Sequence, residues 1–238
     1  MFANKNLLAL SVVALLTACG GGGSSAPATP AVTSFPVQKA LATAYTNGVQ
    51  NTLSVTGTVS NGTTSNALTG SLTFTLGKSS ATTFNGVAAL QDTATINGNL
   101  VANGVSLPFN SSSTVYMNAN YGPIGQSVVG QYCVTTTDGV YPANATVGQT
   151  GNVYTFSCYT DSTKKVANGG VAVSYVTVAG SAANTLDVKL ITSVYDIANK
   201  VTGSGATTYT ITADGTPSLT RFEIITTANN VTLNILAQ

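Results

Sequence analysis

The residue types that usually carry chemistry are few in this chain, and histidine is absent from it. Serine and cysteine triads, zincin motifs and the commonest general bases all use histidine. The carboxylates are scattered and mostly stand in turn-like sequences: Asp92, Asp138, Asp161, Asp187, Asp196, Asp214 and Glu223. No two of them form an evident acid and base pair, which a carboxylate-based hydrolase, the one enzymatic alternative, would need. We therefore predict no catalytic residues, no metal site and no cofactor.

The first of the three cysteines follows an apolar segment at the N-terminus. Lys5 supplies a positive charge, and "LLALSVVALL" (residues 7–16) is an apolar run of ten residues. A helix needs about 20 apolar residues to span a bilayer, so this run is too short for a stable transmembrane helix. The small residues Thr17 and Ala18, just before Cys19, suit a signal peptidase. We interpret residues 1–18 as a signal peptide.

The four residues "LTAC" (residues 16–19) resemble the lipobox of bacterial lipoproteins. In that class the cysteine sulfur takes a diacylglycerol, the signal is cut just before it, and the new N-terminus is acylated. The resemblance implies that Cys19 is the lipid attachment site and that several acyl chains, such as palmitate, hold the protein in the cell envelope. Gly20 after the cysteine is compatible with sorting to the outer membrane. An ordinary secretory signal with an accidental cysteine is the alternative.

A linker follows Cys19 and leads into one domain. "GGGGSSAPATPAVT" (residues 20–33) begins with glycine and serine, which favour a flexible chain, and continues with two prolines, which stiffen it. Nothing later in the chain resembles a second linker. We therefore divide the chain into a lipidated cysteine with its linker (residues 19–33) and a single domain (residues 34–238).

The charge of the chain is low and balanced. Charged residues make up 6% of the sequence, and removal of Lys5 with the signal peptide leaves seven basic and seven acidic residues. A protein without a basic cluster lacks the electrostatic footprint for phosphate backbones or anionic lipid surfaces. Nucleic acid is therefore not an expected partner, and the membrane is a partner through the lipid on Cys19.

One helix is expected, in "SFPVQKALATAYTNG" (residues 34–48). Ser34 is a possible N-cap, an apolar stripe includes Val37 and Leu41, and Asn47-Gly48 is a stop signal. The rest of the chain alternates apolar and hydroxyl residues, which is typical of strands. The expected strands cover residues 52–60, 68–76, 81–90, 115–121, 128–136, 153–160, 171–178, 186–195 and 209–213, with two hairpins in addition. This predicts an all-β antiparallel meander of about a dozen short strands, as a curved sheet, a barrel or a sandwich.

The two hairpins have a predicted register. Asn103-Gly104 favours a two-residue turn, because type I′ turns need positive φ at both central positions. That turn places Leu100 opposite Leu107 and Gly98 opposite Phe109. A turn at Asn229-Asn230 likewise places three C-terminal pairs opposite each other: Phe222 and Ala237, Ile224 and Ile235, Thr226 and Leu233. Two surface ion pairs are also expected, Arg221 with Glu223 and Asp187 with Lys189.

Cys133 and Cys158 are predicted to form a disulfide. Export would place them in an oxidising compartment, both lie in expected strands, and lipidation of Cys19 leaves an even pair. A redox pair or a metal site has no support, since the chain has neither a CxxC motif nor a histidine.

The layout of one helix before a long antiparallel meander is similar to that of the half-barrel carriers that shuttle lipids and lipoproteins across the periplasm, although no motif carries this resemblance. Two classes of function follow as hypotheses. One is a binding module for an apolar or amphiphilic ligand, with Leu72, Phe74, Leu100 and Phe109 as candidate pocket residues. The other is a structural, interaction or adhesion protein of the envelope, in which those residues form a closed core.

Overall fold

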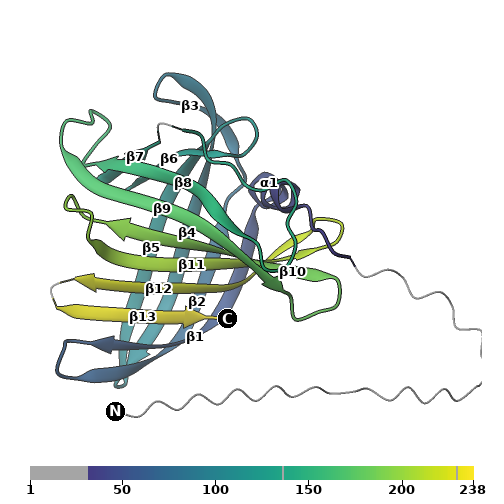
Figure 1. The fold of residues 1–238 in the computed structure, drawn as a ribbon. Helices are drawn as coiled ribbons and strands as arrows, with labels where there is room; N and C mark the ends of the chain where they lie inside the picture. The colour runs from purple at the N-terminus through teal and green to yellow at the C-terminus, as the bar shows by residue number, and fades with distance from the viewer. Residues whose placement is uncertain (1–31, 136, 229) are drawn as a thin grey trace, which may run out of the picture. The chain divides into compact units, whose positions relative to one another are not determined.

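The strands follow one another in a single antiparallel meander that closes on itself (Figure 1). The computed structural model describes residues 32–135, 137–228 and 230–238, and Val32–Gln238 form one unit. The elements are α1 (Val37–Asn47), β1 (Val49–Ser60), β2 (Ser65–Leu76), β3 (Ser80–Phe84), β4 (Val87–Ala102), β5 (Val105–Met117), β6 (Pro123–Val128), β7 (Gln131–Val134), β8 (Thr150–Tyr159), β9 (Ala167–Ala179), β10 (Thr185–Tyr195), β11 (Val201–Thr212), β12 (Pro217–Ala228) and β13 (Val231–Ala237).

Two pairings between strands that are not neighbours in the chain close the ring. β1 pairs with β13, with Val55 opposite Ala237, and β2 pairs with β4, with Leu72 opposite Gly98. β3 pairs only with β4 and lies outside the ring. The predicted all-β meander is confirmed, and its form is a closed barrel. The similarity in layout to half-barrel carriers does not extend to this closure.

The predicted hairpin registers are confirmed. Leu100 lies opposite Leu107 and Gly98 opposite Phe109. The C-terminal pairs are also as expected, with Ile224 opposite Ile235. Turn chemistry and alternation of side chains agree in both hairpins, which is why local sequence was sufficient to set their registers.

Several strand boundaries differ from the prediction because turns were missed. Residues 81–90 are not one strand: Asn85 and Gly86, with φ of 50° and 82°, form a turn between β3 and β4. Residues 128–136 likewise contain a turn at Val129-Gly130, between β6 and β7. β11 begins at Val201 rather than at residue 209. Ser34 is not an N-cap, since Pro36 precedes the helix and makes no side-chain capping bond.

Three glycines on the inner face let neighbouring strands approach closely. A Cβ on Gly57 of β1 would lie 2.1 Å from the carbonyl oxygen of Asn234, and one on Gly98 of β4 would lie 2.2 Å from that of Ser71. Gly70 of β2 has a similar contact with the oxygen of Asn99, at 2.2 Å. Glycine at such positions permits the strong coiling that a closed sheet requires.

The helix α1 covers one end of the barrel (Figure 1). Its buried face consists of Val37, Ala40, Leu41 and Ala44, which belong to the main core. The chain enters at this end, where the amide and carbonyl of Phe35 bond those of Ala145 at 2.9 Å. The hairpin turns that follow β1, β4, β8 and β10 lie at the other end.

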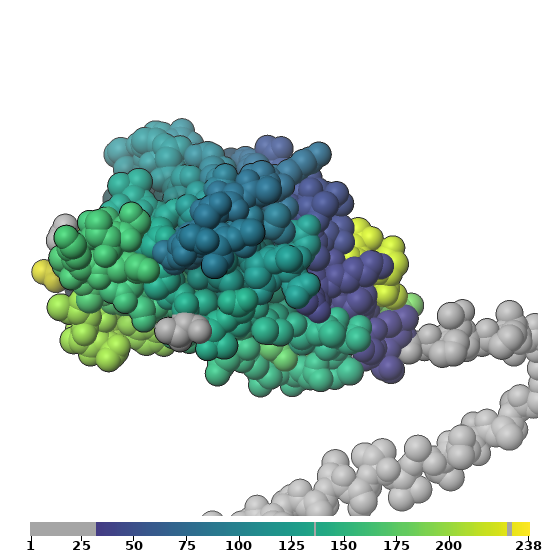
Figure 2. Space-filling view, turned by 90° about the horizontal axis from the view of Figure 1, so that it is seen from above, coloured from purple at the N-terminus to yellow at the C-terminus, as the bar shows by residue number. Residues whose placement is uncertain are grey.

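A second, smaller apolar cluster lies around β3. The segment that contains β3 lies on the face of the molecule shown in Figure 2. The ring of Phe84 stacks on Tyr116, with centroids 4.2 Å apart, and contacts Tyr132 at 5.3 Å. Gly125 makes room for it, because a Cβ there would lie 2.2 Å from the Phe84 ring. The β3–β4 hairpin is thereby fixed against β5, β6 and β7.

The expected ion pairs are partly present. Arg221 Nε lies 2.8 Å from Glu223 Oε1. The expected pair of Lys189 with Asp187 is absent from the described residues. Lys189 donates instead to Glu223, at 2.9 Å. Asp187 accepts instead from the hydroxyl of Thr210, at 2.6 Å. The order of the strands explains the difference, because β12 lies only one strand away from β10 and the Lys189 side chain reaches Glu223 across β11.

Candidate ligand site in the barrel

The inner faces of the strands and helix α1 surround a cavity of about 220 Å³. Four tyrosines contribute to its lining: Tyr45, Tyr141, Tyr154 and Tyr209. The other lining side chains are of two kinds. Apolar ones include Phe74, Leu76, Ile96 and Leu190, and hydroxyl or amide ones are Ser111, Ser113, Gln126, Thr192 and Thr207. The cavity thus offers apolar walls together with hydrogen-bonding groups, as ligand sites usually do.

The four tyrosines come from separate parts of the fold. Tyr45 lies on α1, Tyr141 in the segment between β7 and β8, Tyr154 on β8 and Tyr209 on β11. The hydroxyl oxygens of Tyr45 and Tyr141 are 3.2 Å apart and share a hydrogen bond. Burial raises the pKa of all four phenols above the ordinary value. They therefore stay neutral at physiological pH and act as hydrogen-bond donors and acceptors.

Asp92 is the one carboxylate of the described residues that is buried. It lies on the inner face of β4, opposite Val115, and is 2% exposed. Neither carboxylate oxygen has a hydrogen-bond partner among the described residues. Burial raises the pKa of Asp92 to about 6. The nearby amides of Gly77 and Thr93 limit this rise in pKa, although neither makes a hydrogen bond of ordinary geometry.

The predicted pocket residues divide between core and cavity. Leu72 and Leu100 are fully buried in the core, whereas Phe74 lines the cavity. Phe109 is half-buried and packs against the core. The sequence prediction missed the tyrosines, since no local pattern links residues on four separate elements. Asp92 did leave a signal, because it occupies an inward position of the alternation that continues through Ala94 and Ile96.

A larger depression, of about 490 Å³, lies at β8, β9 and the turn after β10. Its lining includes Tyr159, Gly170, Tyr195 and Ile197. It contains none of the four cavity tyrosines. The barrel cavity is therefore the stronger candidate, since its polar groups converge from many elements.

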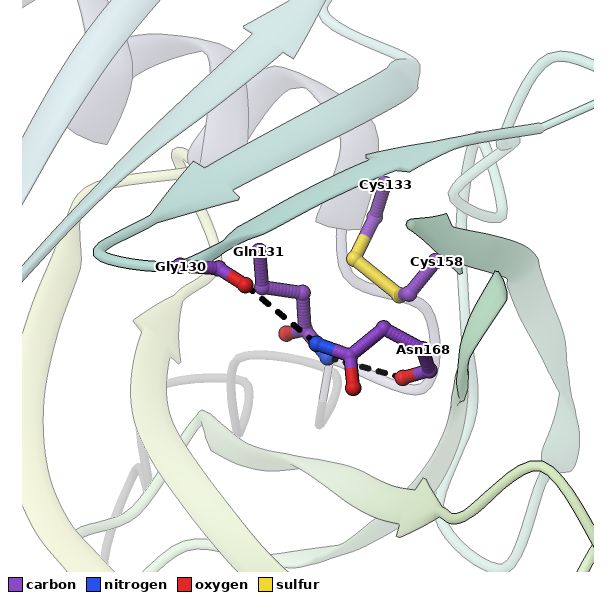
Figure 3. The surroundings of a disulfide bond; sticks show 5 residues. All are labelled: Gly130, Gln131, Cys133, Cys158 and Asn168. Atoms are coloured by element: carbon purple, nitrogen blue, oxygen red, sulfur yellow. Dashed lines mark hydrogen bonds between the residues drawn. A yellow bond between two sulfur atoms is a disulfide. The ribbon is translucent and has the colours of Figure 1, made fainter. Parts of the chain in front are cut away.

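The predicted disulfide is confirmed (Figure 3). Cys133 of β7 lies directly opposite Cys158 of β8, and their sulfurs are bonded at 2.05 Å. The neighbouring turn is also held, because Asn168 Nδ2 donates to the carbonyl of Gly130 and Gln131 Nε2 donates to the carbonyl of Asn168 (Figure 3). These bonds join the short β6–β7 hairpin to the start of β9.

Cys19, the predicted signal peptide and residues 20–31 of the predicted linker lie outside the described residues. Within the described part, no helix combines the length and apolar character needed to cross a membrane. The same residues bring together no group of three cysteine, aspartate or glutamate side chains that could hold a metal ion.

Comparisons with protein-family models, with curated proteins and with solved structures find no match to this chain.

Proposed function

We propose that this chain is a lipid-anchored binding protein of the bacterial cell envelope, without catalytic activity, whose barrel takes a small amphiphilic molecule into its cavity. The observation that carries this proposal is the convergence of four tyrosines and five hydroxyl or amide side chains on one apolar-walled cavity. Structural cores fill such space with apolar side chains, because polar groups are costly to bury without partners.

The size of the cavity limits the ligand. A volume of about 220 Å³ is below the roughly 300–1,000 Å³ of pockets that take drug-sized ligands. A whole acyl chain with its headgroup would not fit. The expected ligand is a small molecule with an apolar part for the walls formed by Phe74, Ile96 and Leu190, and a polar part for the tyrosines.

The anchor supports a position in the envelope. The resemblance of residues 16–19 to a lipobox implies lipid on Cys19, and an extended segment from there to Val32 would reach about 45 Å. Val32 is fixed at the α1 end, where its amide bonds Asn184 Oδ1 at 3.2 Å. We therefore expect the linker to join the barrel at its helix-covered end and to allow a distance between the barrel and the membrane surface.

Native mass spectrometry of the exported mature chain, residues 19–238 with Cys19→Ala, tests the proposal. We expect a bound small molecule that is released on unfolding. Ala94→Trp should abolish it, because Ala94 lines the cavity and the indole would fill that space. Thr93→Trp is the control, since Thr93 is the adjacent residue on β4 but is exposed. If the wild-type chain carries no small molecule and binds none that is added, the proposal is contradicted.

A protein partner is the second candidate, and one feature of β5 favours it. β6 pairs with β5 only from Thr114 onward, so residues 105–113 have β4 as their one neighbour among the described strands. Val105 and Leu107 are exposed in this segment. Pro108 lies between β4 and solvent there, and proline within sheets is found mainly on edge strands. Such an edge can accept an added strand. Ser112→Pro would block strand addition, because proline has no amide to donate. Chemical cross-linking in cells is the measurement. If the variant loses cross-links to an envelope protein and keeps its ligand binding, the result favours this candidate.

A further inference from the structure

We propose that the ligand of the barrel is an uncharged molecule that carries an acceptor oxygen, such as the carbonyl of a ketone or an ester, on an apolar frame. The tyrosine hydroxyls of the cavity donate hydrogen bonds to that oxygen. This inference rests on the proposed function, because it concerns the same cavity. It adds the charge of the ligand and the chemical group that the tyrosines bind.

The lining of the cavity favours an uncharged ligand. The described residues that line it are apolar or carry hydroxyl or amide groups, and no lysine, arginine, aspartate or glutamate is among them. The four phenols stay neutral as well, because burial raises the pKa of each. An ion that entered such a cavity would lose its hydration without gaining an opposite charge, which is strongly unfavourable. An uncharged molecule avoids this cost.

Two hydroxyls of the cavity lack a partner within the protein. Tyr154 and Tyr209 both line the cavity, and neither hydroxyl makes a hydrogen bond to a described residue. Tyr209 is 6% exposed. In the described residues, the polar side-chain atoms that are both sealed and unpaired belong to Asp92 and Arg221 alone. The two tyrosine hydroxyls therefore keep a surface that another molecule can contact. Since buried polar groups are nearly always paired, these hydroxyls indicate a partner inside the cavity.

The cavity has more donors than its own tyrosines can use. Each phenol has one hydrogen to donate, and the bond between Tyr45 and Tyr141 uses one of the four. The other three have no acceptor among the described residues. A carbonyl oxygen has two lone pairs and no hydrogen of its own, so it can accept from two of these hydroxyls without adding a donor.

The hydroxyls are held close together before a ligand arrives. The ring of Tyr154 stacks on Phe156, with centroids 4.2 Å apart, and the hydrogen bond of 3.2 Å fixes Tyr45 against Tyr141. Tyr45 also lies near enough to Tyr154 and Tyr209 to raise the pKa of their phenols, after the larger effect of burial. Groups that are already in place lose less conformational freedom when a ligand binds.

Three probes of nearly equal shape test the inference. Acetophenone carries a carbonyl, α-methylstyrene has a methylene group in place of the oxygen, and benzoate is the charged analogue. Binding of each to residues 19–238 with Cys19→Ala is measured by calorimetry at pH 7.5. We expect acetophenone to bind about tenfold more tightly than benzoate, because the cavity offers no opposite charge.

Tyrosine variants show whether the hydroxyls bind the carbonyl. Tyr154→Phe with Tyr209→Phe should lower the ratio of the affinities for acetophenone and α-methylstyrene by about fivefold, because it removes the two unpaired donors and keeps both rings. Tyr159→Phe with Tyr195→Phe is the matched control, since these two tyrosines line the depression at β8 and β9 instead. Retention of the far-ultraviolet circular dichroism spectrum shows that each variant is folded.

The outcomes separate this inference from the proposed function. Benzoate that binds as tightly as acetophenone would overturn the inference, and so would an affinity ratio that the cavity variant leaves unchanged, as expected if the hydroxyls hold only water. A charged molecule found in the wild-type barrel by native mass spectrometry would also overturn it, while the proposed function would stand. If no probe binds and no molecule co-purifies, both are rejected.

Discussion

The hydroxyl oxygens of Tyr45 and Tyr141 lie 3.2 Å apart and join helix α1 to the segment between β7 and β8. These two elements are otherwise linked by backbone bonds, such as the amide of Gln38 to the carbonyl of Pro142 at 3.1 Å. The tyrosine pair is thus part of what holds the helix over the cavity.

Tyr141→Phe should lower the free energy of unfolding by about 1 kcal/mol, because it removes one hydrogen bond and leaves the Tyr45 hydroxyl without that partner. Urea unfolding measures the change. Tyr159→Phe is the control, since the Tyr159 hydroxyl makes no hydrogen bond among the described residues and its loss should change little. Equal effects of the two substitutions would contradict a structural role for the tyrosine pair.

Asp92→Asn should stabilise the protein at neutral pH. The unfolded chain loses the Asp92 proton near its ordinary pKa of 3.8, whereas the folded chain keeps it until about pH 6. Stability therefore falls as the pH rises between these values and stays lower above them, by about 3 kcal/mol. The variant should lack this fall, so that it gains stability at pH 7.5 and equals the wild type near pH 3.5.

Urea unfolding of the ligand-free proteins across this pH range provides the measurement. Asp187→Asn serves as the comparison, because Asp187 accepts a hydrogen bond and is only half-buried. An Asp92→Asn variant that is no more stable than the wild type at pH 7.5 would show that Asp92 has a compensating partner in the folded protein.

Loss of the disulfide should destabilise the barrel without changing its fold. Cys133 and Cys158 are 25 residues apart in the sequence, and closing a loop of that length is worth about 3 to 4 kcal/mol in the chain-entropy model. The double variant Cys133→Ala and Cys158→Ala should lower the unfolding free energy by this amount. Added reductant should lower the stability of the wild type and leave the variant unaffected; a wild type indifferent to reductant would contradict the prediction.

Gly98→Ala should destabilise the barrel by about 1 to 3 kcal/mol, since the new methyl group would overlap the backbone of β2 at Ser71. Gly203→Ala on β11 is a matched control. A Cβ at that position would have its nearest neighbour at 3.5 Å, which is an ordinary contact. The difference between the two melting temperatures measures the effect, and similar melting temperatures would argue that the strands can separate at little cost.

Cys19→Ala should release the protein from membranes, because the variant lacks the sulfur that a lipobox cysteine uses for lipid attachment. Fractionation of cells into membrane and soluble parts gives the result. Cys133→Ala with Cys158→Ala is the appropriate comparison, since it removes the other two cysteines and should leave the protein with the membranes. Unchanged membrane association of Cys19→Ala would count against lipidation.

Much of the fold was predictable because its rules are local. Asn103-Gly104 and the alternation beside it were sufficient for the register of β4 and β5. Asn85-Gly86 has the same turn chemistry, but it stands among small residues whose alternation is weak, and the sequence was interpreted as one strand. The closing pair of β1 and β13 has no local signal, because hydrophobic patterning does not specify which distant edges meet.

The candidate site was predictable only in fragments. Phe74 followed from its strand pattern, since every inward apolar residue is a candidate. Tyr141 stands in an irregular segment, and Tyr45 on the helix, so their meeting depends on how the end of the barrel is covered. Such contacts arise from tertiary packing, which single-strand periodicity does not encode. Asp92 is different, because a carboxylate at an inward position interrupts the alternation of apolar and polar residues, and this can be recognised in the sequence.

The pairing of β1 with β13 has a consequence for how the protein folds. Val55 and Ala237 lie opposite each other although they are 182 residues apart in the sequence. Hairpins such as β4–β5 can form as soon as their residues are available, whereas the last seam must wait for all the strands between. Until then the edges of β1 and β13 are unprotected and able to pair with other chains. A chaperone that binds unpaired strand edges can therefore reach these two edges until the seam closes.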